Sequence, residues 1–246
     1  MNAFDPNCPH CVAENVHGTL KSDAPPAPCR RHILSDPQET LRKKLTQCQY
    51  CFKSKGPDVV LQRCGGCEIE LYCSQTCQRA AWKTHKPKCA INRAQSQLIG
   101  ATGVNLLKSL RAFTGKHRPT ISEVGVRALG VLGDPTRTER DVLLIALRPR
   151  LDSQRVETAF WVTAASVVPL SYFPTADEMR GQLTLAADAN RRSGMAGALF
   201  VVLVDTGSGI TNVVPVGFPE GPDNLEPLST TWEEFLKRRL NAGLVV

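Results

Sequence analysis

Four short pairs of cysteine and histidine decide the fold of this chain: Cys48-Gln-Tyr-Cys51, Cys64-Gly-Gly-Cys67, Cys73-Ser-Gln-Thr-Cys77 and His85-Lys-Pro-Lys-Cys89. Between the pairs lie 12, 5 and 7 residues. A structural Zn²⁺ ion takes four thiolate or imidazole donors in a tetrahedron. Eight donors at these spacings therefore predict two zinc sites within one short segment.

Each pair has a local geometry that suits one metal ion. A Cys-x2-Cys pair brings two sulfur atoms together on a tight turn, and Gly65-Gly66 suits such a turn because glycine accepts positive φ. Cys73 and Cys77 are four residues apart, as are His85 and Cys89, so each pair spans about one helical turn. All ten cysteines lie at or before Cys89. A disulfide scaffold is the weaker interpretation, because such scaffolds are small and secreted and no signal-peptide pattern opens this sequence.

The same segment carries a family resemblance. Tyr72 before Cys73, Gln78 after Cys77, then Trp82 and the closing His85-x3-Cys89 resemble the MYND-type zinc finger, over 42 of 246 residues. The resemblance implies a cross-braced topology in which Cys48, Cys51, Cys73 and Cys77 hold one zinc ion, and Cys64, Cys67, His85 and Cys89 hold the other. Zinc binding would supply much of the folding free energy, on the order of 10 kcal/mol per site. Because protein donors fill both tetrahedra, both ions are expected to be structural rather than catalytic.

The resemblance also implies a peptide-binding surface. In corepressor members of the family, a proline-containing peptide adds as a strand beside a short hairpin and packs on a glutamine and a tryptophan. The matching side chains here are Gln78 and Trp82, one helical turn apart, and the matching strand contains Leu71 and Tyr72. A tryptophan face suits a proline ring, and main-chain hydrogen bonds give affinity with little sequence demand. The alternative is that Trp82 packs inside the finger while Gln78 is solvated.

A further cysteine–histidine group lies near the N-terminus. Cys8, Cys11, Cys29 and His32 have the spacing Cys-x2-Cys-x17-Cys-x2-His, which could hold a third zinc ion. The alternative is a flexible tail with reactive thiols, because the intervening stretch is rich in proline and has little to pack.

The fold class expected for the whole chain is α+β, with a small finger followed by a separate mixed domain. The predicted divisions are an N-terminal segment over 1–35, a short helix over 36–47, the finger over 48–89 and an α+β domain over 94–246. A capping pattern starts the first helix at Asp36. In the last domain, periodicity and capping predict the following elements: helices over Ala94–Phe113, Ile121–Leu132, Ala176–Ser193 and Trp232–Asn241, and strands over Val142–Arg148, Glu157–Val168, Ala198–Val204 and Ile210–Val216.

Charge is concentrated in the finger. The net charge is +7, and residues 41–89 hold ten basic residues against three acidic ones. Seven thiolates and two zinc ions would lower the net charge of this segment from +7 to about +4. Nucleic acid is therefore only a weakly supported partner, since the finger lacks a helix of regularly spaced Arg and Lys with base-reading residues. No stretch is long and apolar enough for a membrane span, so an intracellular protein, in nucleus or cytoplasm, is expected.

Two functions fit these features. The first is a protein-interaction adaptor whose finger captures short, proline-containing motifs of partner proteins, with transcriptional regulation as the process. The second is an enzyme of unknown class in the C-terminal domain, with the finger as a targeting module. After the finger, His117 is the only histidine in the sequence, and no cysteine follows Cys89. Residue types that commonly act in catalysis are therefore sparse in the C-terminal domain. Some MYND fingers lie within SET-domain methyltransferases, but the Asn-His-Ser motif of those enzymes does not occur here. The sequence favours a protein without enzymatic activity.

Overall fold

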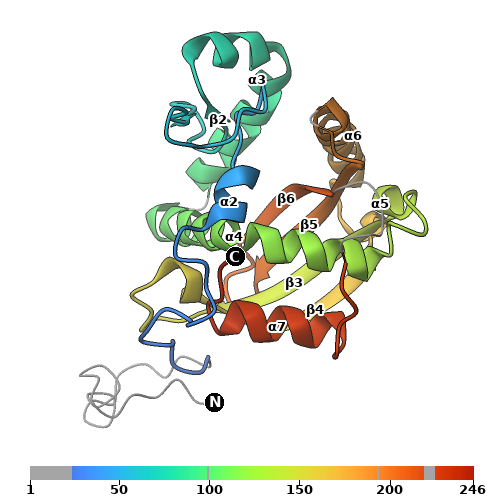
Figure 1. The fold of residues 1–246 in the computed structure, drawn as a ribbon. Helices are drawn as coiled ribbons and strands as arrows, with labels where there is room; N and C mark the ends of the chain where they lie inside the picture. The colour runs from blue at the N-terminus through green and yellow to red at the C-terminus, as the bar shows by residue number, and fades with distance from the viewer. Residues whose placement is uncertain (1–23, 99, 193, 219–224) are drawn as a thin grey trace.

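A computed structural model describes residues 24–98, 100–192, 194–218 and 225–246 of the chain. Within them, a zinc-finger region lies at one end of a larger domain built on a mixed sheet, as Figure 1 shows. This arrangement confirms the expected α+β fold. Among the described residues, no helix is both long and apolar enough to cross a membrane.

The sheet has four strands in the order β4-β3-β5-β6. The central strands β3 and β5 are parallel, and each edge strand is antiparallel to its neighbour. The strand bounds are Asp141–Pro149 for β3, Phe160–Pro169 for β4, Gly197–Asp205 for β5 and Thr211–Phe218 for β6. All four strands lie where the sequence predicts them, although β4 begins three residues later because a 3-10 turn, η1, occupies Val156–Thr158.

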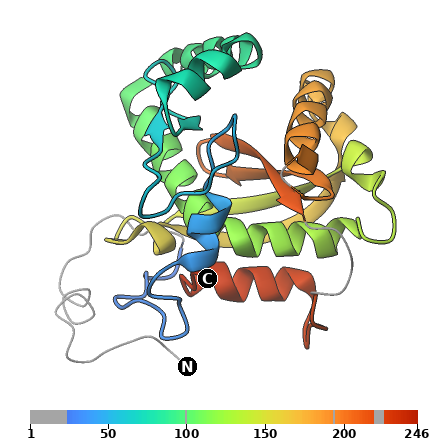
Figure 2. The same ribbon diagram turned by 45° about the horizontal axis from the view of Figure 1, so that its top comes forward.

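Helices cover both faces of the sheet (Figure 2). On one face, α4 (Gly100–Leu129) and α7 (Trp232–Asn241) pack on Leu143, Val201 and other apolar side chains of the central strands. On the other face, α6 (Ala176–Arg192) packs on residues that alternate with these, such as Val142 and Phe200. The alternation follows from the two-residue period of a strand. Two short elements, η2 (Leu170–Tyr172) and α5 (Arg137–Arg140), lie at the ends of the strands.

One helix, α4, contains most of both helices predicted on either side of Pro119, while residues 94–98 belong to α3. Helix α4 passes through Pro119 without interruption, so the helix start predicted at Ile121 is wrong. Proline removes one backbone hydrogen bond and crowds the carbonyl of the residue four before it. Packing on the sheet outweighs this cost, since Phe113 and Ile121 are both fully buried. Gly125 lets helix α4 lie close to strand β5, because a Cβ atom at this position would lie 2.7 Å from Leu199 Cδ1.

Helix α3 crosses the boundary predicted between the finger and the last domain. It spans Gln75–Leu98 and includes Pro87, so the predicted boundary near residue 94 lies inside a helix. The hydroxyl of Ser74 accepts the Cys77 N–H at 3.1 Å and caps the start. The predicted start of the last domain therefore lies within α3, which ends at Leu98, and the long helix of the sheet domain, α4, begins at Gly100.

The helix predicted over 36–47 is shorter than expected. It is α2, Thr40–Leu45, and Asp36 does not cap it as the residue just before the helix. The Asp36 carboxylate instead accepts the Thr40 N–H at 2.6 Å across a turn. Glu39, with a positive φ of 51°, stands immediately before the helix, which explains the late start.

The segment 24–36 packs against the sheet domain. The Asp36 N–H donates to the Val245 carbonyl at 2.9 Å. The buried Arg150 guanidinium donates from Nε to the Pro25 carbonyl at 3.0 Å. Along the sequence, the finger therefore lies between two stretches that contact each other, an arrangement that local sequence patterns did not predict.

Candidate metal centre

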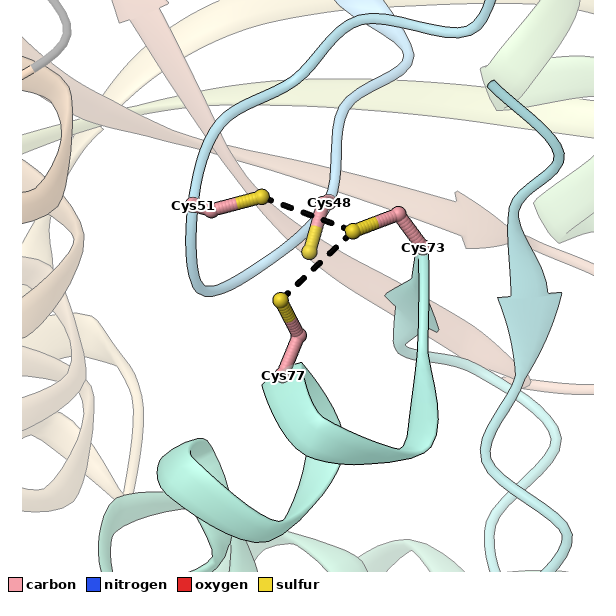
Figure 3. A group of neighbouring side chains, drawn as sticks. All are labelled: Cys48, Cys51, Cys73 and Cys77. Carbon is pink, nitrogen blue, oxygen red and sulfur yellow. Dashed lines mark hydrogen bonds between the residues drawn. The ribbon is translucent and has the colours of Figure 1, made fainter. Parts of the chain in front are cut away.

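The first cluster comes from three separate pieces of chain. Cys48 and Cys51 lie on a loop after α2, Cys73 directly follows strand β2 (Leu71–Tyr72), and Cys77 lies in the first turn of α3. Figure 3 shows the four side chains converging on one point. The Cys73 Sγ atom lies 3.5 Å from both Cys51 Sγ and Cys77 Sγ.

The second cluster is more deeply buried. Cys64, Cys67 and Cys89 are between 2% and 6% exposed, and His85 is 2% exposed. The Cys64 and Cys89 Sγ atoms are 4.0 Å apart, and His85 Nε2 lies 3.3 Å from Cys64 Sγ. Cys64 follows strand β1 (Gln62–Arg63), which is antiparallel to β2.

Both clusters fit zinc. In each, the four donor atoms lie within 4.8 Å of one another. Zn–S bonds of about 2.3 Å in a tetrahedron place sulfur atoms about 3.8 Å apart, close to the distances in both clusters. The protein therefore has two structural zinc sites, one with four cysteines and one with three cysteines and a histidine. The sites are interleaved along the chain, as the cross-braced topology requires.

The thiols are prepared unequally for metal. Burial opposes ionisation of Cys64, but backbone N–H groups of the knuckle and the His85 ring lower its pKa to about 6. Burial likewise opposes ionisation of Cys48, while backbone N–H groups lower its pKa to about 7. Neighbouring thiols raise the pKa of Cys73 to about 12, and burial with a neighbouring thiol raises that of Cys89 to about 11. Zinc binding must therefore displace protons from the thiols with raised pKa values.

Two further side chains support the second site, a role that sequence patterns alone did not predict for them. Glu70 Oε2 lies 2.8 Å from His85 Nδ1 and accepts the Tyr72 hydroxyl at 2.6 Å. With Nε2 facing the metal position, this carboxylate lies beside the other ring nitrogen, within reach to orient the ring, although the contact is not aligned as a hydrogen bond. The Gln78 amide nitrogen lies 3.6 Å from Cys64 Sγ. Alternation along the strand, which puts Glu70 and Tyr72 on one face, was the available sequence signal.

The predicted peptide-binding residues lie in different environments. Tyr72 is 2% exposed, so its side chain belongs to the finger's interior. The Leu71 carbonyl already accepts the Gln49 N–H at 2.9 Å. Gln78 contacts Cys64 and is not simply solvated. Trp82 is 44% exposed, with one edge against the His85 ring at 5.9 Å between centroids.

The predicted third site falls partly outside the described residues. Cys8 and Cys11 are not among them, whereas Cys29 and His32 are. His32 Nδ1 accepts the Leu34 N–H at 3.2 Å. Within the described residues, the two finger clusters are the groups of donors close enough for a metal ion. The third site therefore stays a prediction.

Comparison with known proteins agrees with this geometry. Residues 48–89 match the family model described as the MYND finger, so this segment is a MYND-type zinc finger, a module of protein–protein interaction. No solved structure matches the chain.

Several curated proteins resemble the finger. Mouse "Histone-lysine N-methyltransferase Smyd1" is 46% identical over 43 residues, which are 18% of this chain and 8% of that protein. Arabidopsis thaliana "Histone-lysine N-methyltransferase ASHR1" is 32% identical over 53 residues, or 21% and 10%. Schizosaccharomyces pombe "SET domain and MYND-type zinc finger protein 6" is 42% identical over 50 residues, or 20% and 10%. The chain thus spans about a tenth of the length of these relatives, and the likeness concerns the finger.

Proposed function

We propose that this protein is an adaptor whose finger captures short, proline-containing motifs of partner proteins. The observation that carries the proposal is the position of Trp82 on α3. Its ring is 44% exposed, while Cys77, His85 and Cys89 of the same helix bind zinc. Metal binding thus holds the helix rigid, and an exposed aromatic face on a rigid element suits a proline ring.

A bound peptide would extend the hairpin on the side of β1. The outer edge of β2 is engaged by Gln49 at Leu71, whereas Gln62 and Arg63 of β1 are both exposed. Strand addition needs an edge with free backbone groups. Val60, two residues before this edge, is 70% exposed and offers apolar contact to a peptide.

We further propose that the chain has no enzymatic activity of its own. His117, the last histidine of the sequence, is the most conventional candidate for a general base. It is 1% exposed, and Nε2 lies 2.8 Å from the Glu157 carbonyl, inside the domain. The curated relatives named as methyltransferases match this chain over the finger, so their activity carries no weight for the sheet domain. Seven thiolates need a reducing compartment, which supports an intracellular location, and action in transcription would place the protein in the nucleus.

Selection from a displayed library of random peptides tests the adaptor. The wild-type chain is expected to enrich peptides with proline at a fixed position, and Trp82→Ala should abolish this enrichment. Tyr50→Ala is the matched control, since Tyr50 is 50% exposed on the same finger. Both variants should keep two zinc ions. Enrichment of peptides without proline, or equal enrichment by Trp82→Ala, would refute the proposal.

A further inference from the structure

A row of basic side chains follows one face of α3. Arg79, Lys83, Lys86 and Arg93 are at positions i, i+4, i+7 and i+14 of the helix, and all four are exposed. This spacing places them on one face, and we call them the basic row. At 1.5 Å of rise per residue, the row is about 21 Å long. Figure 1 shows α3 at the top of the molecule, away from the sheet.

The charge of this row is not balanced by acidic partners in the part of the chain that the structure describes. Helix α3 contains no acidic residue. Among the described residues, none of the four side chains has an ion-pair partner. An ordinary solvated helix has acidic residues one turn from its basic ones, which stabilise it. A face of uncompensated cations therefore indicates an anionic partner.

The wider surroundings are basic too. Between residues 41 and 93 there are eleven basic residues and three acidic ones. Two of the three acids are engaged: Glu70 lies against His85 and Glu68 pairs with Lys108 at 3.1 Å. Seven thiolates with two divalent ions bring three negative charges, which leaves a net charge of about +5. A long-range field of this sign attracts polyanions.

We infer that the basic row of α3 binds the phosphate backbone of a nucleic acid. The row was hidden in the sequence because Pro87 suggests a break, whereas the helix continues through it and aligns Arg93 with the other three. An acidic protein is the less suitable partner, because protein interfaces have an apolar core and are depleted of lysine. The row has one exposed aromatic neighbour, Trp82, which lies one turn from Lys86. Towards its other end the neighbours are small or polar, and a hollow beside Arg93 is lined by Ala90, Ala94 and Gln97. Nucleic-acid interfaces are polar and strongly positive.

The chemistry of the row predicts binding without sequence preference. The row consists of Lys and Arg side chains, which bind the phosphate groups of a nucleic-acid backbone. Its length of about 21 Å corresponds to roughly six nucleotides of one strand of a duplex. Phosphate contacts fix position but carry no sequence information directly. The inference does not depend on the proposed peptide site, which uses Trp82 and the edge of β1.

Fluorescence anisotropy with the full chain tests this inference. The probes are short labelled duplex and single-stranded DNA and RNA, at salt concentrations from about 50 mM to about 200 mM. One variant combines Arg79→Gln, Lys83→Gln, Lys86→Gln and Arg93→Gln. The matched control removes the same charge from exposed positions of the sheet domain: Arg140→Gln, Arg180→Gln, Arg191→Gln and Arg192→Gln.

The row variant should bind at least about tenfold more weakly than the wild type, and its salt slope on duplex DNA should be lower by about three to four. The control should bind within about twofold of the wild type. If the row variant loses zinc, the pair Lys83→Gln with Lys86→Gln replaces it, with an expected decrease in slope of about two. Equal weakening of row variant and control would overturn the inference, as would binding of poly-glutamate as tight as that of a nucleic acid of equal charge.

Discussion

Replacement of His117 tests whether the sheet domain uses this histidine for structure. Burial lowers the pKa of His117 to about 4, from an ordinary value of 6.5, although the contact with the Glu157 carbonyl opposes the change. The unfolded chain therefore binds a proton at a higher pH than the folded chain does. The contribution to stability is fully present above pH 6.5 and is lost as the pH falls towards 4. At about 1.4 kcal/mol for each unit by which the two pKa values differ, the loss amounts to about 3 kcal/mol.

Urea unfolding at several pH values, from about pH 7 to about pH 4, measures this loss. The wild-type chain and His117→Gln are compared in a Trp82→Phe background, so that fluorescence reports Trp161 and Trp232 of the sheet domain. Zinc release at low pH affects both chains alike and cancels in the difference. The free energy of unfolding of the wild type should fall by about 3 kcal/mol more than that of His117→Gln. Parallel pH profiles, or a wild type that gains stability on acidification, would refute the assignment of a buried neutral histidine.

Two other substitutions have expected outcomes. Glu70→Gln should lower zinc affinity at the three-cysteine site by about 10- to 100-fold, as measured by chelator competition. The affinity of the four-cysteine site, and both affinities of the control Glu68→Gln, should stay unchanged. Equal zinc affinity in the two variants would contradict the role of Glu70. Gly243→Ala should destabilise the chain by on the order of 2 to 4 kcal/mol, because φ is +66° and the new Cβ would lie 2.5 Å from Thr158 Cγ2. Gly209→Ala, at φ +73° with nothing within 4 Å of the new Cβ, should reduce stability less. Thermal unfolding of the two variants measures the difference, and equal losses of stability would contradict the crowding at Thr158.

The sequence could predict those features that depend on local spacing. The two zinc sites followed from ligand intervals and the resemblance. The bounds of α7, Trp232–Asn241, were predicted from the helical spacing of its apolar side chains, and in the structure Thr231 caps the helix and accepts the Glu234 N–H. The turn between β5 and β6 lies in the gap that the two predicted strands leave at residues 205–209, and the Asp205 carboxylate accepts the N–H groups of Gly207 and Ser208 there.

Features that depend on tertiary packing could not be predicted in this way. Pro119 and Pro87 both suggest helix ends, yet each lies inside a helix. Packing of α4 on the sheet keeps the helix continuous at Pro119. Pro87 is flanked by His85 and Cys89, donors of one zinc site, so metal binding holds the helix on both sides of the proline.

Contacts between distant segments were equally hidden. The Arg150 guanidinium reaches Pro25, 125 residues away. The Glu39 carboxylate, next to α2, contacts Lys116 of α4 at 2.5 Å. No local pattern links such residues, because their proximity depends on how the whole chain folds. The support of His85 by Glu70 had a weak signal in strand alternation, whereas the contact of Gln78 with Cys64 had none.

X-ray absorption at the zinc edge tests the two closed sites most directly. The measurement uses the full chain with Cys8→Ser and Cys11→Ser, so that these N-terminal cysteines do not bind additional zinc. Two zinc ions per chain are expected to share seven sulfur donors and one nitrogen donor, with Zn–S distances of about 2.3 Å. An oxygen donor in either shell would indicate a position open to water. That result, or a finger that remains folded with no zinc bound, would contradict the account.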